Sequence, residues 1–505
     1  MSYIKLDPCR AISIYGAPMS NQPNILIIQA DQHRQDCLGA YGNPDVKTPH
    51  IDSLATDGVR YDNSFCPYPV CTPSRYSFLT SLYARQHLGA SNHCTIPQGL
   101  PTFPRVLKNA GYKTKAVGKM HLTPTYADVG FEELVLAEQN GAGRYEDDYH
   151  RWLRDEGLYD RIDLIDQERE YRQNAPQAYW DTVGAMVSDL DEAHHSTTWI
   201  ADRAMEELKT WNSGGHLLMT SFIKPHHPFD TPAPWHEMYD PQTLQMLPGY
   251  TDTPFEHDIQ YARGYFPYTD MTEQKIRLAM AMYYATISQI DHHVGRMIQQ
   301  LKDNNLYNNT LILYNSDHGE YLGFHHLLLK GNYMYDPLIK VPLIIKYPNQ
   351  TNAGTVSTDL VNTIDVGPTL LNIANCETPT AMIGSDLRTD VQNRKYMFAE
   401  MGRGREYMVR SHTHKLLWCK DAHQSQFFDL QEDPFELHNC ITHPESQQQI
   451  TNMKNALVQW MLFDAPSSVH LDENAPVINQ PNVPPRNTKQ CEDLYAYFKE
   501  RMNEK

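Results

Sequence analysis

A cysteine at the predicted start of a helix is the most informative reactive group of this sequence. In the segment 71–75, which reads Cys-Thr-Pro-Ser-Arg, Thr72 can cap a helix and Pro73 suits its first turn, and Leu79 and Leu82 continue at helical spacing. The free N–H groups and the dipole at a helix start favour anionic ligands. A single cysteine is more often a buried thiol, but this pattern predicts an anion-binding position beside Cys71.

Polar residues follow each of four apolar runs, which are the predicted strands 24–30, 113–118, 216–223 and 310–315. The residues in these positions are Asp31 and Gln32, Lys119 and His121, Lys224 and His226, and Asp317 and His318. Continuous apolar strands that alternate with helical stretches predict a mostly parallel sheet, and such sheets bind ligands beyond the carboxyl ends of their strands. The sequence therefore predicts that one sheet edge carries all four sets.

The elements around these residues predict an α/β fold, in which a large, mostly parallel sheet is sandwiched by helices. The longest predicted helix, 272–304, carries an apolar stripe at alternating steps of four and three residues, which is typical of a core face. Asp291, His292 and His293 lie beside the stripe, and we expect them to be structural or solvated. Residues 131–200 are charged and aromatic and are predicted to form helical insertions that flank the site.

The pattern changes after Gly384. Four short runs at hairpin spacing, at about 396–400, 407–410, 415–418 and 427–430, predict a smaller antiparallel sheet. The Pro- and Asn-rich stretch 464–487 predicts a surface strap, which a last helix follows. We therefore expect an N-terminal extension (1–22), a catalytic α/β domain (23–384) and a C-terminal subdomain (385–505).

Composition excludes several classes of protein. The 505 residues include 43 Lys and Arg against 61 Asp and Glu, a net charge of −18, which argues against nucleic-acid binding. No apolar run approaches the roughly 18 residues that a membrane span needs. The nine cysteines are scattered, so a disulfide framework is not expected. Because Lys5, Asp7 and Arg10 interrupt any leader-like stretch, the sequence predicts a cytoplasmic protein without a membrane partner.

The segment 71–75 resembles the Cys/Ser-x-Pro-x-Arg signature of the formylglycine-dependent (type I) sulfatases of the alkaline phosphatase superfamily. Further segments resemble the family's blocks in the same order, namely 24–32, 39–42, 48–52, 118–121, 224–229, 317–320, 330–335 and 428–437. Together they cover about residues 23 to 440. The resemblance implies a sulfuric ester hydrolase, in which a formylglycine-generating enzyme oxidises Cys71 to Cα-formylglycine.

The chemistry of sulfate transfer agrees with such a modification. A thiolate that attacked a sulfate ester would form a stable S-sulfo adduct. A hydrated aldehyde instead presents two geminal hydroxyls, and its adduct can collapse by expelling sulfate and regenerating the aldehyde.

A divalent metal is the cofactor that these residues imply. Asp31, Gln32, Asp317 and His318 form an oxygen-rich set that suits a hard cation and would contact it together with residue 71. Many family members have Asp at the position of Gln32 and Asn at that of His318, so this site would carry less negative charge. We expect Ca²⁺, and the nitrogen ligand leaves Mg²⁺ or Mn²⁺ as alternatives.

Three basic residues take roles in sulfate chemistry by the same resemblance. Arg75 would hold the formylglycine hydrate beside the helix start. Lys119 and Lys330 would bind the sulfate oxygens and stabilise the charge of the transition state.

Three histidines complete the predicted set. His121 would remove the proton from the spare hydroxyl and drive sulfate release, and His226 would protonate the leaving alcohol. His325 is included because a histidine precedes the corresponding lysine by five residues in several relatives.

The sequence leaves the substrate open. A sulfated carbohydrate, such as a glycosaminoglycan-derived oligosaccharide, is the leading hypothesis, and possible sugar platforms are Trp152, Trp180, Trp235 and Tyr239. One alternative is a phosphonate or phosphate mono- or diester hydrolase of the same superfamily. The other is an unmodified pseudoenzyme that only binds sulfated ligands.

Overall fold

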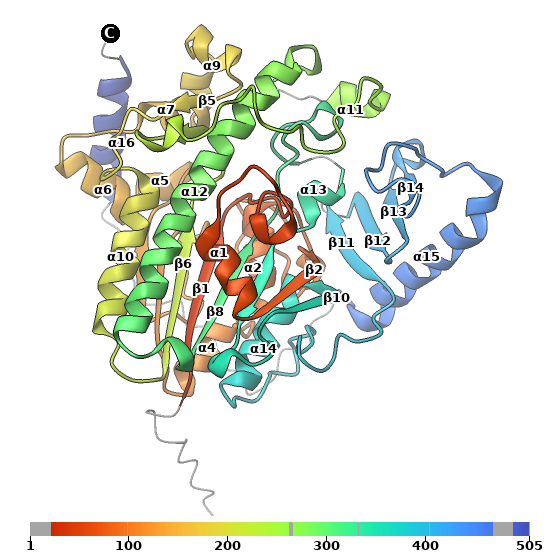
Figure 1. Cartoon of the computed structure of the whole chain (residues 1–505), viewed down its shortest axis with the longest axis horizontal. Helices are drawn as coiled ribbons and strands as arrows, with labels where there is room; N and C mark the ends of the chain where they lie inside the picture. Colours follow the sequence, from red (N-terminus) through yellow and green to blue (C-terminus); the bar gives the residue numbers. More distant parts are fainter. Residues whose placement is uncertain are drawn as a thin grey trace, which may run out of the picture.

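An eight-stranded sheet forms the centre of the computed structural model, which describes residues 22–503 except 98, 262–265, 332, 403 and 468–487. The strand order is β10-β2-β9-β8-β1-β6-β3-β4, and Figure 1 labels β10, β2, β8, β1 and β6 of this sheet. The strands are β1 (Asn24–Ala30), β2 (Val59–Phe65), β3 (Lys113–Gly118), β4 (Glu133–Leu136), β6 (His216–Phe222), β8 (Thr310–Ser316), β9 (Leu343–Lys346) and β10 (Thr355–Asn362). Only β9 runs antiparallel to its neighbours, so the predicted mostly parallel sheet is confirmed.

The four predicted strands lie side by side at the centre, in the order β8-β1-β6-β3. Every residue of β1, β6 and β8 is buried, which explains why these strands read as continuous apolar runs. In the register of the sheet, Ala30 lies opposite both Phe222 and Ser316. The residues that follow these strands therefore start from the same edge, as the sequence predicted.

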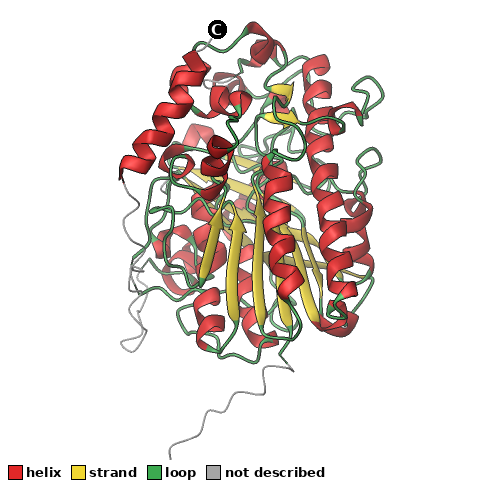
Figure 2. Cartoon of the chain, turned by 90° about the vertical axis from the view of Figure 1, so that its left-hand side faces the viewer, coloured by secondary structure: helices red, strands yellow, loops and turns green. Residues whose placement is uncertain are grey.

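Helices cover both faces of the sheet (Figure 2). Leu26 and Ile28 point to one face, which is covered by α1 (Pro49–Thr56), α10 (Ser196–Thr210) and α12 (Glu273–Asp303). Ile25 and Ile27 point to the other face, against α2 (Cys71–Thr80), α4 (Phe103–Asn109) and α14 (Val366–Ile373). This alternation follows from the two-residue period of a strand. The helix predicted over 272–304 is confirmed as α12.

Shorter elements surround the carboxyl edge of the sheet. The predicted helical insertions are present as α5 (Gly141–Arg144), α6 (Asp148–Asp155), α7 (Arg161–Gln167), α8 (Arg169–Arg172) and α9 (Gln177–Asp181). The other short elements are α3 (Ala84–His87), β5 (Ala185–Val187), β7 (Phe229–Thr231), α11 (Glu256–Tyr261) and α13 (Asp336–Ile339). None of the described helices has the length and apolar character that a membrane crossing requires.

The predicted antiparallel sheet is also confirmed. It consists of β11 (Met397–Met401), β12 (Glu406–Arg410), β13 (His414–Cys419) and β14 (Gln426–Asp429) in sequential order. One face packs against α15 (Gln447–Gln459) through Val409, Leu416 and Phe427, and the other packs toward the large sheet through Met408 and Leu417.

The last helix, α16 (Thr488–Asn503), lies on the insertions of the large domain rather than beside the small sheet (Figure 1). Its Leu494 and Phe498 are buried against Leu164 of α7. The domain boundaries at 22/23 and 384/385 stay predictions. The predicted extension lies outside the described residues except for Gln22, and so does the predicted strap except for 464–467.

Asp291, which the sequence marks as structural or solvated, caps a neighbouring helix. Its carboxylate on α12 is buried and accepts the backbone N–H groups of His50 (3.0 Å) and Ile51 (2.7 Å) in the first turn of α1. Thr48, the residue at the cap position, instead accepts the N–H of Gly39 through its hydroxyl. Asp291 therefore satisfies two of the N–H groups that a helix start leaves open.

We expect the Asp291→Ala variant to lose about 1–3 kcal/mol of unfolding free energy, because two backbone donors lose their acceptor. Urea denaturation followed by circular dichroism measures the loss. Asp291→Asn is the matched control, since its amide oxygen can still accept these bonds. An unchanged midpoint for the alanine variant would refute the capping role.

The unfolding free energies of the native protein and of Asp291→Asn should depend differently on pH. Burial raises the pKa of Asp291 to about 7, and the bonds from Ile51 and His50 only partly offset this. When a carboxyl has a higher pKa in the folded than in the unfolded protein, the fold loses stability as the pH rises from the unfolded-state pKa to the folded-state pKa. The unfolding free energy of Asp291→Asn minus that of the native protein should therefore increase between about pH 4 and pH 7.

Candidate active site

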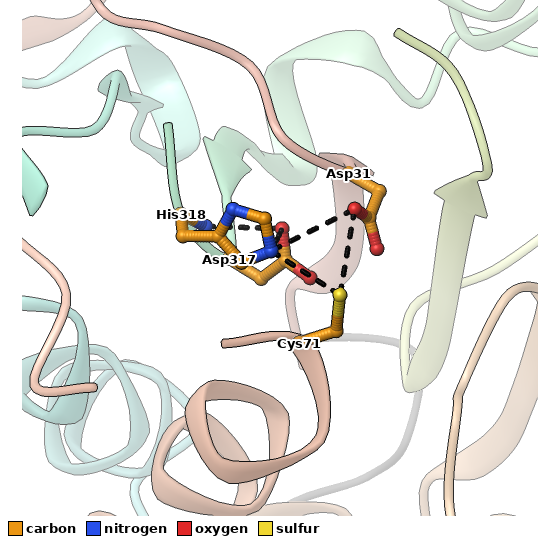
Figure 3. A group of neighbouring side chains, drawn as sticks. All are labelled: Asp31, Cys71, Asp317 and His318. Atoms are coloured by element: carbon orange, nitrogen blue, oxygen red, sulfur yellow. Dashed lines mark hydrogen bonds and ion pairs between the residues drawn. The ribbon is translucent and has the colours of Figure 1, made fainter. Parts of the chain in front are cut away.

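Cys71 is the first residue of α2, whose start faces the sheet edge between β1 and β8 (Figure 3). Its side chain is buried, and Sγ lies 3.2 Å from Nε2 of His318 and 3.8 Å from Oδ1 of Asp31. The helix start agrees with the sequence prediction, but Val70 occupies the cap position, not Thr72. The Thr72 hydroxyl donates instead to the carbonyl of His121, at 2.7 Å.

Four buried side chains form a compact group that fits a divalent cation. The potential ligand atoms of Asp31, Cys71, Asp317 and His318 all lie within 4.8 Å of one another. Asp31 comes from the end of β1 and Asp317 and His318 from the end of β8, and the side chains point toward a common centre (Figure 3). Two carboxylates with an imidazole are suitable ligands, and the Cys71 sulfur completes the group.

Gln32 borders this group but interacts with a lysine. Its backbone φ is 64°, in the left-handed region. Two hydrogen bonds hold this conformation: the Tyr283 hydroxyl donates to the Gln32 carbonyl, and the Gln32 N–H donates to Asp317. The side-chain Oε1 accepts from Nζ of Lys330 at 2.6 Å, and Nε2 donates to Glu320. The structure thus brings Gln32 to the site, and its role as a metal ligand stays a prediction.

Arg75 joins the two carboxylates. Its Nε donates to Asp317 and its Nη2 to Asp31, both at 2.9 Å, and its Nη1 donates to the carbonyl of Lys119 at 2.6 Å. The guanidinium and both carboxylates are buried. Because Arg75 follows Cys71 by four residues, about one helical turn, both side chains face the same strand ends.

The cations around Asp31 and Cys71 stabilise negative charge. Lys119 lies 2.8 Å from Asp31, at Oδ2. Burial would raise the pKa of Asp31, but Lys119 and Arg75 hold it well below its usual value. Burial and Asp31 would likewise raise the pKa of the Cys71 thiol, yet Lys330 and Lys119 lower it well below the usual value. Position 71 therefore favours an anionic side chain.

His226 and Lys330 are in direct contact. Nζ of Lys330 lies 2.6 Å from Nε2 of His226, and Nδ1 of the same ring donates to the carbonyl of His227 at 2.5 Å. Burial, together with Lys330 and Lys119, lowers the pKa of His226 to about 3. His226 is therefore neutral at pH 7, and its Nε2 accepts the lysine hydrogen bond.

His121 is held by a residue that the sequence reasoning missed. Its backbone N–H donates to the buried carboxyl of Glu138 at 2.8 Å, and its ring Nδ1 has no hydrogen-bond partner in the described part of the chain. The next residue, Gln139, accepts from Nζ of Lys119 at 3.1 Å. Both follow β4, a short strand within residues that were predicted to be helical. Recognition of that strand would have placed Glu138 and Gln139 at the active edge.

His325 is the predicted site residue that the structure places away from Cys71. Its Nδ1 lies 3.1 Å from Asp258 and its Nε2 lies 3.2 Å from the carbonyl of Phe435. Its backbone is left-handed, with a φ of 51°, which directs the ring toward α11. The adjacent His326, rather than His325, lines the cleft next to Lys330 and His226.

A cleft of about 280 Å³ adjoins this group. Its lining residues are Gln32, Asn92, Asn140, Asp166, Gln167, His226, His227, Phe266, Tyr321, His326, Lys330 and the leucines at 327–329. Trp152, Trp180, Trp235 and Tyr239, the predicted sugar platforms, are not part of this described lining. Trp180 instead packs edge-on against Tyr179 and Phe266, and the Phe and Tyr side chains of the lining are Phe266 and Tyr321.

Comparison with known proteins identifies the family. The model of the sulfatase family matches residues 23–376, and the model described as N-sulphoglucosamine sulphohydrolase, C-terminal, matches residues 323–462. An arylsulfatase of Clostridium perfringens is 28% identical over 470 residues, covering 87% of this chain and 94% of the relative. An N-acetylglucosamine-6-O-sulfatase of Bacteroides thetaiotaomicron is 26% identical over 84% of each chain.

A solved structure shows the same fold. The phosphonate monoester hydrolase of Silicibacter pomeroyi superposes with a TM-score of 0.74 at 24% identity, over 89% of this chain and 96% of that one. The family models cover both the strands that carry the site and the small sheet. The chain therefore belongs to the sulfatase family of the alkaline phosphatase superfamily, and it is a sulfuric ester hydrolase.

Proposed function

We propose that this sulfatase releases sulfate from a sulfated carbohydrate, such as a glycosaminoglycan-derived sugar, through a formylglycine formed from Cys71. The observation that carries the proposal is the position of residue 71, at a helix start and within one group with Asp31, Asp317 and His318. The N-acetylglucosamine-6-O-sulfatase relative supports a sugar as the substrate class. A formylglycine-generating enzyme is the partner that would supply the modification.

The proposed cofactor is one divalent cation, held by Asp31, Asp317, His318 and residue 71, with Gln32 at its edge. The donor set supports Ca²⁺ first, because most donors are oxygens, and the imidazole keeps Mg²⁺ and Mn²⁺ as alternatives. When bound, the cation would supply positive charge that polarises the sulfate and favours an ionised hydroxyl at position 71.

The lysines of the site provide the charge that a sulfate group needs. Lys119 contacts Asp31 and lowers the pKa of residue 71, so its ammonium group is directed to the same point as the nucleophile. Lys330 borders the cleft on the other side, next to Gln32 and His226. We assign both to the sulfate oxygens, while Arg75 fixes the two carboxylates and orients residue 71.

The histidines divide the proton transfers. His226 is neutral in the free protein, and the negative charge of a bound sulfate would favour its protonated form. From that form, Nε2 could protonate the departing alcohol. His121 keeps a ring nitrogen without a partner in the described structure, which suits a base that takes the proton of the second hydroxyl as sulfate leaves.

A phosphonate or phosphate ester hydrolase is the second candidate. The similarity to a phosphonate monoester hydrolase supports it at the level of the fold only, whereas the arylsulfatase and the N-acetylglucosamine-6-O-sulfatase, at 28% and 26% identity, act in sulfate chemistry by name. Sulfate and phosphonate esters tested side by side on metal-replete protein decide between them. Faster phosphonate than sulfate release at saturating metal would favour the second candidate.

Protein produced together with a formylglycine-generating enzyme should carry an aldehyde or its hydrate at position 71, as read by peptide mass spectrometry. Cys71→Ala should lower kcat by at least about 10³-fold, because the nucleophile is lost, without unfolding the chain. Cys66 is an internal control in the same digest, since it is also a buried free thiol but lies outside the signature. Active protein with an unmodified Cys71 thiol would contradict the mechanism.

Asp317→Asn should weaken divalent-metal affinity at least about tenfold and lower kcat with it. Isothermal titration with Ca²⁺, Mg²⁺ and Mn²⁺ measures the affinity. Asp291→Asn is the matched control, because it changes a buried carboxyl outside the site. Full activity of protein shown by elemental analysis to be free of metal would disprove the assignment.

His121→Ala should release one equivalent of alcohol and then stall with residue 71 sulfated, because only the second step needs this base. His226→Ala should instead slow the first step by about 10²–10⁴-fold, and the loss should shrink for a nitrophenyl ester, whose leaving group needs no proton. Rapid-quench kinetics and intact-mass measurements distinguish the two. Equal losses on both esters, with no adduct in the His121 variant, would reject this division of roles.

A further inference from the structure

The cleft beside Lys330 carries little positive charge. Among its described lining residues, Lys330 is the one Lys or Arg side chain, and Asp166 is the one acidic side chain. Lys330 contacts Gln32 and His226. The proposed function assigns it to the sulfate that is removed, so it is not available to a second charged group. The rest of the cleft offers no further fixed cation among these residues.

Asp166 and His227 form a pair in the cleft wall, in which the second ring nitrogen of His227 lies 2.9 Å from the carbonyl of Val183, so both nitrogens face acceptors. The Asp166 carboxylate lies 2.8 Å from Nδ1 of His227 and accepts the Tyr179 hydroxyl. Burial would raise the pKa of Asp166, but His227 and Tyr179 lower it to about 2, so the carboxylate is ionised. His326 adds no free cation to the cleft, because burial lowers its pKa and its Nε2 contacts the carbonyl of Thr251.

Neutral amides provide the polar groups of the cleft. The Asn140 side chain has no hydrogen-bond partner among the described residues. Asn92 uses Oδ1 to accept the Thr72 N–H at 3.1 Å, and its NH₂ group is left for a ligand. Gln167 donates through Nε2 to Asp166, and its Oε1 is available to accept a hydrogen bond from a ligand. Such groups match hydroxyl and acetamido substituents, which both donate and accept.

The size of the cleft makes this lining selective. About 280 Å³ lies just below the roughly 300–1,000 Å³ of sites for drug-sized ligands. A single sugar ring would therefore touch the walls with most of its substituents. Phe266 and Leu329 supply apolar surface for the ring's C–H face.

From these observations we propose that the cleft selects sugars whose only charge is the sulfate to be removed, such as a monosulfated N-acetylhexosamine. This inference rests on the proposed function. A second sulfate or a carboxylate on the same ring would lose water without gaining a free cation, because His227 is paired with Asp166 and Lys330 is assigned to the sulfate that is removed.

Sulfate release from N-acetylglucosamine 6-sulfate, glucosamine 2-N,6-O-disulfate and nitrophenyl sulfate tests the proposal on the matured, metal-loaded protein. The 6-O-desulfation of the disulfate should have a kcat/KM at least about tenfold below that of the monosulfate, because its second charge stays unpaired. A ratio near one, a preference for the disulfate, or turnover of the nitrophenyl ester alone would overturn the inference. Failure to release sulfate from all three esters would instead refute the proposed function.

Asn140 offers a matched pair of variants that changes charge at nearly constant size. In Asn140→Lys the disulfate-to-monosulfate ratio of kcat/KM should rise about tenfold, whereas in Asn140→Met it should not rise. Nitrophenyl sulfate turnover in each variant serves as the reference for its folding. An equal change of the ratio in both variants would show that charge does not determine selectivity and would overturn the inference.

Discussion

The buried guanidinium of Arg75, placed between the carboxylates of Asp31 and Asp317, is the interaction on which the rest of the site depends. Two carboxylates that end adjacent parallel strands would repel each other in a buried position, and Arg75 and Lys119 offset that charge. The register of β1 and β8 sets the separation of the acids, and the helical repeat sets the position of Arg75 relative to Cys71. Backbone geometry therefore sets the position of Cys71, and removal of either acid would leave a cation buried and partly unpaired.

The small sheet contributes to the site through the loop that carries Lys330. At its start, Glu320 accepts the backbone N–H groups of Leu322 and Leu329. At its end, Asp336 is held by Arg410 of β12 and Lys415 of β13, each at 2.9 Å. Because the loop is fixed at both ends, the Lys330 side chain is held next to His226. The antiparallel sheet thus supports the loop that carries Lys330.

Much of this arrangement could be predicted from the sequence, because burial on both faces turns central parallel strands into apolar runs. The residues that follow β1, β3, β6 and β8 were placed at one edge on that basis, and the helix start at Cys71 followed from Pro73 and the spacing beyond it. The direction of His325 could not be predicted, since it depends on a left-handed residue within a loop. β4 has four residues, of which one is buried, so it lacks the apolar run that marks its neighbours. The position of α16 depends on contacts with α7, distant in sequence.

The order of the strands also determines when the site can form during synthesis of the chain. Gln32 and Asp317 are hydrogen-bonded although 285 residues separate them in the chain. At about 5–20 residues per second, a ribosome needs roughly 15–60 s to make that stretch. During this interval β1 lacks β8, and the pocket that buries residue 71 in the finished protein, where its side chain is 1% exposed, is not closed. The topology thus leaves the side chain at position 71 outside a closed pocket while synthesis continues and encloses it only when β8 joins the sheet.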